Sequence, residues 1–197
     1  KAEQALAQKL FGLQPNYQNL LRQAGTKVNA AATVSELLSS ITDLLMTNLS
    51  PRNAAAYLRD DLSLQMTTVV SMGDRGGTLD EQRLPETSPL VRWLATHQTC
   101  LVAEELPRRA GPEEAAPIQE ELRSLGLTVC VPMLIDDTLV GFLGLAEKVT
   151  RQMYFVGELD FLETLGREIA LALRYRRMQE EVFRKNRLVE LGTIAAG

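Results

Sequence analysis

The stretch VCVPMLIDDTLVGFLGL, residues 129–145, gives the clearest indication of the fold. Two apolar runs, 128–135 and 138–147, are joined by Asp136 and Asp137, a two-residue connection typical of a β-hairpin. Such a turn needs positive φ angles, which Asp tolerates better than most residues. Because both runs are apolar almost throughout and do not alternate with polar residues, we expect both faces of the sheet to be covered.

Upstream of the hairpin, residues 34–49 predict a helix. Their apolar side chains recur at the three- and four-residue steps of one helical face. Thr33 or Ser35 can cap this helix, and Pro51 cannot continue it. Ser88 followed by Pro is a good start for a second, shorter helix. The other short elements that we expect are strands at 54–60, 64–72 and 100–103, and helices at 88–97 and 118–125.

Proline marks the remaining boundaries. Residues 107–117 hold three prolines and a glycine, which favours a loop. Residues 157–194 hold none and predict one long helix. Residues 2–24 have a helical apolar pattern that Pro15 interrupts, so we expect a kink there. The element order is satisfied by an α+β fold, a mainly antiparallel sheet with helices on both faces.

Composition narrows the function classes. The chain has 197 residues, with 21 Lys and Arg against 25 Asp and Glu, which gives a net charge of −4. The mild acidity argues against a nucleic-acid partner, and the two cysteines cannot form a disulfide framework. No run of about 18 apolar residues is present, so we expect no membrane contact in this stretch. The N-terminal residues Lys-Ala-Glu-Gln, 1–4, also lack the basic and then apolar pattern of a secretory signal peptide.

The hairpin resembles the central hairpin of GAF domains, in which a strand ending in Val-Pro-Leu meets a polar turn and a Gly-hydrophobic-Leu strand. Residues 158–173 are similar to the C-terminal helix of that family. Asp137 departs from the family pattern, which often has Gly at this turn position. The resemblance covers about residues 30–180 and implies a GAF-like α+β sensory domain with long signalling helices at both ends.

A second resemblance concerns residues 186–197, NRLVELGTIAAG. They are similar to the segment just ahead of the phospho-accepting histidine of sensor histidine kinases. The organisation that we predict is therefore a helical connector at 1–29, a GAF domain at 30–180 and the start of a dimerisation and phospho-acceptor helix at 181–197. By this interpretation the chain is a piece of a longer kinase and carries no catalytic residue of its own.

The GAF resemblance implies a cavity between the sheet and the short helices on one face. Trp93 is the strongest single candidate because it is the only tryptophan and lies on the expected helix 88–97. Arg75 and Arg92 are the candidate partners of an anionic ligand. The other candidate lining residues are Tyr57, Met66, Thr68, Leu90, Val91, Leu94, Cys130, Val131, Phe142 and Leu143. For any single one of them, filling the core is the more ordinary role.

The long helix also suggests an interface. Apolar residues recur along it at spacings typical of a helical bundle, alongside a basic run that usually marks a solvated face. We predict a homodimer formed through the N-terminal and C-terminal helices. The candidate interface residues are Leu165, Ala172, Tyr175, Val182 and Val189.

Other chemistry has little support in the sequence. The single histidine, His97, stands near no nucleophile motif, and haem ligation by it is disfavoured. Cys100 and Cys130 are too few for a metal site, and we expect both to be ordinary buried thiols. The cyclic-nucleotide signature Asn-Lys-x-Phe-Asp-Glu of some GAF domains is missing, as is a phosphate-binding loop.

The function that we predict is a sensory GAF module of a two-component histidine kinase in the bacterial cytoplasm. It would convert a bound small molecule, or an upstream signal, into a rearrangement of the dimer helices that controls autophosphorylation. A response regulator is the expected partner of the whole kinase, whose ATP and Mg²⁺ would bind in a separate domain. We expect no cofactor in this stretch. The sequence leaves open whether a membrane anchor precedes Lys1. The alternatives are a relay module without ligand and a GAF-fold methionine sulfoxide reductase that uses Cys100 or Cys130.

Overall fold

The computed structural model describes residues 17–73 and 82–195, with side chains as far as residue 179. Its centre is a six-stranded antiparallel sheet in the order β3-β2-β1-β6-β5-β4. The strands are β1 (Asn53–Arg59), β2 (Met66–Gly73), β3 (Arg83–Leu84), β4 (Leu101–Val102), β5 (Val129–Ile135) and β6 (Thr138–Leu145). The helices are α2 (Tyr17–Ala30), α3 (Val34–Leu49), α4 (Pro89–His97), α5 (Leu106–Leu125) and α6 (Val156–Ala195).

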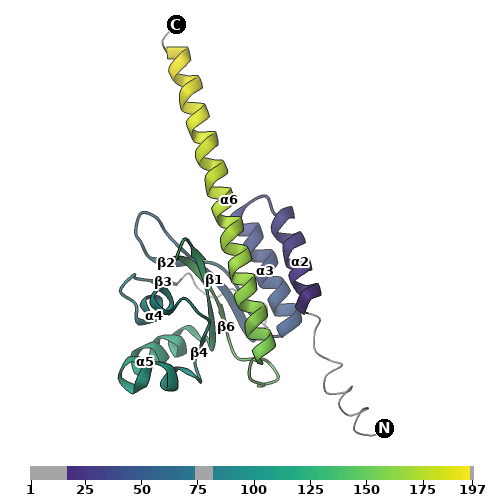
Figure 1. The fold of residues 1–197 in the computed structure, drawn as a ribbon, viewed down its shortest axis with the longest axis vertical. Coiled ribbons are helices and arrows are strands. Elements are labelled where there is room, and N and C mark those ends of the chain that lie inside the picture. Colours follow the sequence, from purple (N-terminus) through teal and green to yellow (C-terminus); the bar gives the residue numbers. More distant parts are fainter. Residues whose placement is uncertain (1–16, 74–81, 196–197) are drawn as a thin grey trace.

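Helices cover both faces of the sheet, as the apolar strands predicted. In Figure 1, α2, α3 and α6 lie on one side and α4 and α5 on the other. Each side has its own core cluster of buried side chains. The α+β class and the mainly antiparallel sheet are confirmed.

The hairpin turn and the helix caps form as expected. Asp136 and Asp137 both have positive φ angles, 46° and 61°. The Thr33 hydroxyl accepts a hydrogen bond from the Glu36 amide at the start of α3, and the Ser88 hydroxyl accepts one from the Val91 amide at the start of α4. Local sequence therefore sets these boundaries.

The loop expected at 107–117 is wrong. These residues belong to α5, which consists of two helical pieces that meet at Gly111, where φ is 74°. Pro107 lies in the first turn of one piece and Pro112 directly follows the kink. Proline at the start of a helix costs little because the amide there has no helical acceptor. The short helix expected at 118–125 is the second half of α5.

Some of the predictions concern residues outside the described ranges. Residues 2–16, including the expected kink at Pro15, and residues 74–81, including Arg75, lie outside them.

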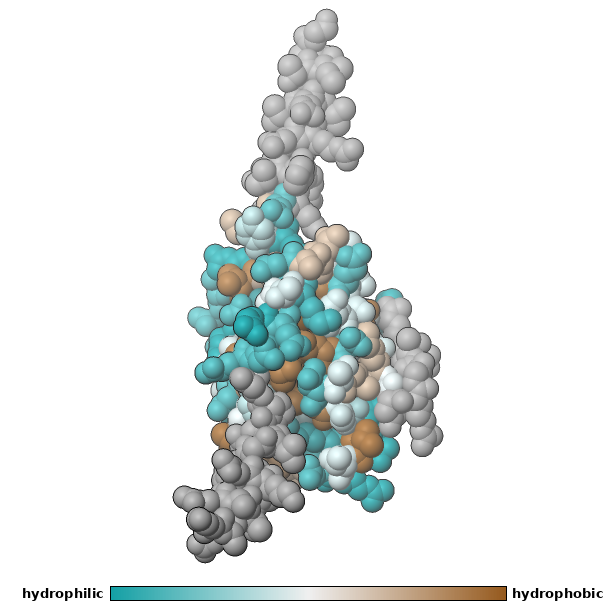
Figure 2. Space-filling view, turned by 90° about the vertical axis from the view of Figure 1, so that its right-hand side faces the viewer, coloured by the Kyte–Doolittle hydropathy of each residue, from teal (hydrophilic) through white to brown (hydrophobic). Residues whose placement is uncertain are grey.

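The side that faces the viewer in Figure 2 is mostly hydrophilic, with smaller apolar areas between. None of the described helices combines the length and the apolar run that a membrane span requires.

Candidate functional site

The α4 side of the sheet holds most of the candidate pocket residues. Tyr57, Met66, Trp93, Cys130 and Phe142 all belong to the core cluster on this side, and each is at most 2% exposed. Leu90, Val91 and Leu94 of α4 join them. The rings of Tyr57 and Phe142, which are paired across β1 and β6, stack with centroids 4.3 Å apart. The sheet face is thus filled by its own side chains.

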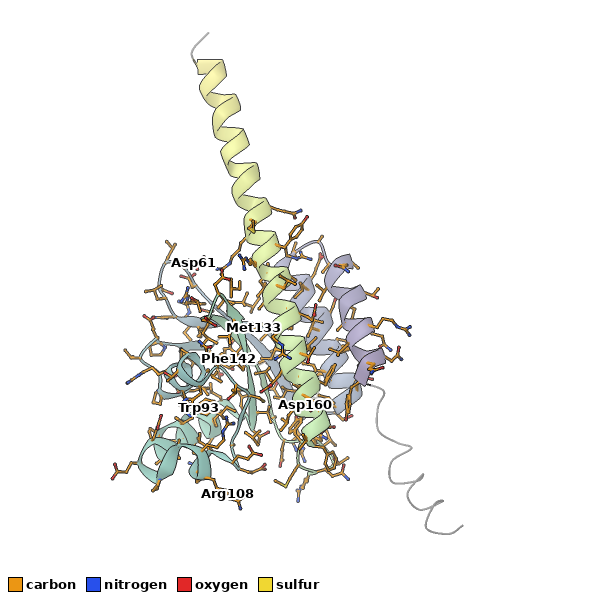
Figure 3. The ribbon with its side chains drawn as sticks, in the orientation of Figure 1. Asp61, Trp93, Arg108, Met133, Phe142 and Asp160 are labelled. Atoms are coloured by element: carbon orange, nitrogen blue, oxygen red, sulfur yellow. The ribbon has the colours of Figure 1, made fainter. Side chains whose placement is uncertain are left out.

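The structure separates the other two hairpin candidates from this group. Val131 and Leu143 belong to the core cluster on the α6 side, because successive residues of a strand point to opposite faces. Figure 3 shows the same division, with Trp93 and Phe142 on the α4 side and Met133 toward α6. A strand pattern that is apolar throughout gives no indication of which residue faces which side.

Trp93 lies at the centre of a contact between α4, α5 and the chain leading to β4. Its ring stacks on His97, with centroids 4.4 Å apart. The Arg109 guanidinium lies 5.2 Å from the same ring centroid and donates hydrogen bonds to the Cys100 carbonyl and the Thr99 hydroxyl. The His97 Nδ1 lies 3.1 Å from the Trp93 carbonyl oxygen. Both contacts of the His97 ring are thus packing and hydrogen-bonding contacts with Trp93, within the fold.

One polar contact on this side was missed from the sequence. The Glu121 carboxylate of α5 accepts hydrogen bonds from the Ser88 hydroxyl and the Leu90 amide, both at 2.8 Å. A carboxylate at a helix N-terminus satisfies free amides and interacts favourably with the helix dipole. Glu121 therefore fixes α4 to α5. Because its partners lie more than thirty residues away in sequence, no local pattern could have revealed it.

Thr68 and Arg92 lie at the edges of this group. Thr68 is half-buried on β2, and its hydroxyl bonds to the backbone of Gln82. Arg92 is exposed on α4 and borders two hollows, one of about 340 Å³ toward α5 and one of about 370 Å³ toward the end of β1. These two hollows flank the packed core beneath α4. Among the described residues, no cluster of His, Cys, Asp and Glu is arranged to hold a metal ion.

A protein-family model matches the part of the sequence that forms this sheet and the helices on both of its faces. It is the GAF domain model, and it matches residues 33–175. The chain belongs to the GAF domain family. No curated protein sequence matches it at a significant level.

Solved structures of other proteins share the fold at low identity. The GAF domain of a phosphoenolpyruvate-protein phosphotransferase from Coxiella burnetii is 17% identical, with a TM-score of 0.63 over 84% of this chain and 97% of that chain. Residues 122 to 287 of a methyl-accepting chemotaxis protein are 13% identical, with a TM-score of 0.64 over 79% and 98%. Free methionine-R-sulfoxide reductase from Neisseria meningitidis is 17% identical, with a TM-score of 0.61 over 83% and 91%.

The two cysteines of this GAF domain are buried and free. Burial, with a smaller contribution from Glu163, raises the pKa of the Cys100 thiol to about 12. Burial also raises the pKa of Cys130 well above its usual value. A nucleophilic cysteine needs the opposite, a lowered pKa and access to a substrate. The two side chains belong to core clusters on opposite sides of the sheet.

The candidate interface residues of the GAF domain differ in exposure. Leu165 is 0% exposed and packs in the core of its own chain, so it is unavailable to a partner subunit. Ala172 is half-buried and Tyr175 is 63% exposed. Among the side chains of α6 that are described after its first turn, the large apolar ones that are exposed are Leu171, Tyr175 and Met178. The side chains of Val182 and Val189 lie outside the described residues.

The basic run of α6 was predicted to be a solvated face, but three of its arginines reach the GAF domain. Arg174 donates to the Asp136 carboxylate in the β5–β6 turn at 2.9 Å. Arg176 donates to the carbonyls of Val28 and Ala31 at the end of α2. Arg177 lies 3.7 Å from the carboxylate of Asp61, after β1. Together these three contacts tie α6 to three different parts of the domain.

Proposed function

We propose that this chain is the sensory GAF module of a dimeric bacterial histidine kinase, acting in the cytoplasm. The observation that carries the proposal is α6, a single helix of 40 residues. Its first turns are buried in the GAF core through Leu162, Leu165 and Ile169. Its far end holds residues 191–195, and in the sequence these begin the run LGTIAAG, residues 191–197, which resembles the segment ahead of a phospho-accepting histidine. One rigid element thus joins the sensor to the proposed kinase segment.

The packing of β5 supports a route for the signal. On one side of β5, Cys130 lies in the cluster with α4. On the other side, α6 comes so close that a Cβ on Gly166 would lie 2.8 Å from the Pro132 carbonyl oxygen. A change of packing under α4 would therefore move the surface on which α6 rests. A ligand that binds one arrangement better than another would shift the population of the two.

The exposed face of α6 supports dimerisation by a second copy of the chain. Leu171, Tyr175 and Met178 follow steps of four and three residues, the spacing of a helical seam. In the sequence, Val182 follows Met178 by four residues, and Val189 follows Val182 by seven, two turns of such a seam. In a parallel pair of α6 helices this face would be buried, and each exit helix would enter the phospho-acceptor bundle beside its partner.

Light scattering tests the seam. The double change Leu171→Lys and Met178→Lys places two charges on the exposed face without touching the core, and should halve the measured mass. The matched control is Leu62→Lys, which changes an equally apolar residue, 97% exposed, in the turn between β1 and β2 and outside the proposed seam. The control should keep the mass of the parent protein. A dimer that survives the double change would contradict the proposed seam.

The kinase assignment is tested on the whole protein that carries this chain. Incubation with radiolabelled ATP and Mg²⁺ should label a histidine, and the label should be lost in acid and kept in base. The label should then pass to a response regulator. Two residues inserted after Gln179 would rotate the helix beyond it by about 200° and should change the rate of labelling. Absence of labelling under all conditions would refute the assignment.

The filled sheet face favours a second candidate, a relay module that binds no small molecule. Tyr57, Phe142 and Trp93 leave the central core closed, so an upstream signal could pass directly from α2 to α6. Native mass spectrometry of the purified domain separates the two candidates. A reproducible bound small molecule supports sensing, and a bare domain whose helix insertion still alters labelling supports relay.

A further inference from the structure

A hollow of about 370 Å³ lies between α4, the end of β1 and the β5–β6 turn. We call it the Arg59 hollow, and define it by Arg59, Met66, Val91, Arg92, Thr96 and Leu139. Its volume falls within the range of small-molecule sites. It lies at the edge of the packed core of the α4 side, so a molecule can enter it without displacing Tyr57 or Phe142.

One side-chain nitrogen of a residue that lines the hollow has no partner. The Nε of Arg59 is shielded from solvent and makes no hydrogen bond. In the part of the chain that the structure describes, the one other such atom is Nε1 of Trp93. Trp93 lines the neighbouring hollow, and Arg92 and Thr96 line both hollows. Both atoms are donors. Leaving a buried donor unpaired is costly, and each such group in a folded protein calls for an explanation.

The lining specifies the chemistry of an occupant. Met66, Val91 and Leu139 are at most 4% exposed and give an apolar floor. The two arginines, Arg59 and Arg92, offer planar donors that match a carboxylate. We propose that the Arg59 hollow binds a small monocarboxylate with an apolar body. The carboxylate accepts from the guanidinium groups of Arg59 and Arg92, and the hydrocarbon part covers the floor.

Two acidic residues at the rim limit the charge of the occupant. Glu86 and Asp137 are exposed and border the same hollow. Their charges offset those of the two arginines, so a polyanion such as a nucleotide gains no net attraction. The rim therefore favours a singly charged ligand.

Backbone strain occurs at the same place. Leu64 borders the hollow with a left-handed backbone, φ 59°. A bulky non-glycine residue rarely adopts this conformation, and strain of this kind clusters at ligand sites and switch regions. It is an observation on the backbone, independent of the unpaired donor.

The hollow also borders an anchor of α6. Asp137 and Thr138 line it. The preceding residue, Asp136, forms an ion pair with Arg174 of α6. A bound carboxylate would thus act on the turn that holds the exit helix. This step rests on the sensing function proposed above and gives that function a ligand class.

The test measures binding to the 197-residue chain. The probe is 4-methylpentanoate, and its control is the uncharged 4-methylpentanamide of the same shape. In NMR spectra of the arginine Nε–H groups, the acid should shift the Arg59 signal saturably, and the amide should not. Arg59→Gln and Arg92→Gln should each weaken binding at least about tenfold, as expected for a charged hydrogen bond. Arg108→Gln, an exposed arginine of α5 away from the hollow, should leave it unchanged.

Four results would overturn the proposal, and the first three concern the binding measurements. They are a lack of saturable shift, an equal response to acid and amide, or unchanged binding in Arg92→Gln, a surface variant that does not disturb folding. A slowly exchanging water at Arg59 Nε that the acid does not displace would also count against it. None of these results bears on the α6 seam or on the phosphorylation assay. A failure of the ligand proposal can therefore be told apart from a failure of the proposed function.

Discussion

The Lys148 ammonium donates hydrogen bonds to both carboxylate oxygens of Glu158, each at 2.6 Å, and both side chains are 7% exposed. Glu158 also accepts from the Phe155 amide at 2.8 Å. The Lys148 nitrogen lies 5.0 Å from the ring centroid of Tyr154 and 5.1 Å from that of Phe155. Because Lys148 follows β6 and Glu158 lies in the first turn of α6, this buried pair joins the sheet to the exit helix.

Removing one member of the pair should be strongly destabilising. Glu158→Gln or Lys148→Met leaves the other charge buried without compensation, which typically costs about 3–5 kcal/mol. Urea unfolding followed by circular dichroism measures the loss. The double change Lys148→Met with Glu158→Leu should recover most of it, since well-packed apolar side chains often replace a buried pair without loss.

A nearby exposed pair gives the control. Arg52 and Glu147 lie 2.9 Å apart with side chains 37% and 53% exposed. Glu147→Gln should change the free energy of unfolding by less than about 1 kcal/mol, as for other exposed pairs. Equal losses for Glu147→Gln and Glu158→Gln would show that burial of the Lys148 pair adds nothing to stability.

Gly141 should not tolerate a side chain. A Cβ at this position would lie 2.3 Å from the Tyr57 carbonyl oxygen and 2.7 Å from Cε of Met133. Backbone cannot yield as a flexible side chain does, so Gly141→Ala would force β6 away from β1. We expect a loss of about 2–4 kcal/mol or failure to fold, at the upper end of single substitutions.

The contrasting glycine is Gly25 in α2. Nothing lies within 4 Å of a Cβ placed there, and alanine is a better helix former than glycine by about 0.5–1 kcal/mol. Gly25→Ala should therefore raise the melting temperature while Gly141→Ala lowers it. A stabilised Gly141→Ala would contradict the close approach of β1 and β6.

Much of this fold could be predicted where local chemistry decides it. The Asp136–Asp137 turn, the Ser88 cap and the apolar face of α3 each depend on a few neighbouring residues, and each is confirmed. The prolines of 107–117 misled the prediction because helix starts and loops favour the same residue. Their meaning depends on the single kink at Gly111.

The candidate site depended on contacts that span the chain. Leu165 faces the core of the domain and Leu171 faces outward because of the side of α6 that meets β5. The spacing of apolar residues along the helix does not decide which side that is. The unpaired Arg59 Nε follows from the way β1, α4 and the β5–β6 turn meet. Glu121 reaches α4 only because α5 folds back on it. None of these has a local pattern.

Both thiols should be inert in the folded protein. Burial, with a smaller contribution from the Glu163 carboxylate, raises the pKa of Cys100 from its ordinary value near 9 to about 12. Below pH 9 this thiol is protonated in both states and its effect on stability is constant. Between pH 9 and 12 the unfolded chain loses the proton first, so stability falls by up to about 1.4 kcal/mol per pH unit.

Urea unfolding at pH 8 and pH 10 measures this fall. Cys100→Ala should show a smaller loss between the two pH values than the parent protein. A thiol reagent at pH 8 should modify cysteine only as fast as the chain unfolds. Rapid labelling of native protein would contradict the burial of the thiols and would favour the reductase hypothesis.

The β5–β6 turn offers a stabilising change. Asp136 and Asp137 both hold left-handed backbone angles, which cost a residue with a Cβ more than they cost glycine. Asp137→Gly should therefore stabilise the domain by up to about 1 kcal/mol, measured as a higher urea midpoint. Asp136→Gly relieves the same strain but removes the carboxylate that holds Arg174 of α6, so its gain should be smaller and should shrink further at low salt. Equal gains for the two changes at every salt concentration would mean that the Arg174 pair contributes nothing to the anchoring of the exit helix.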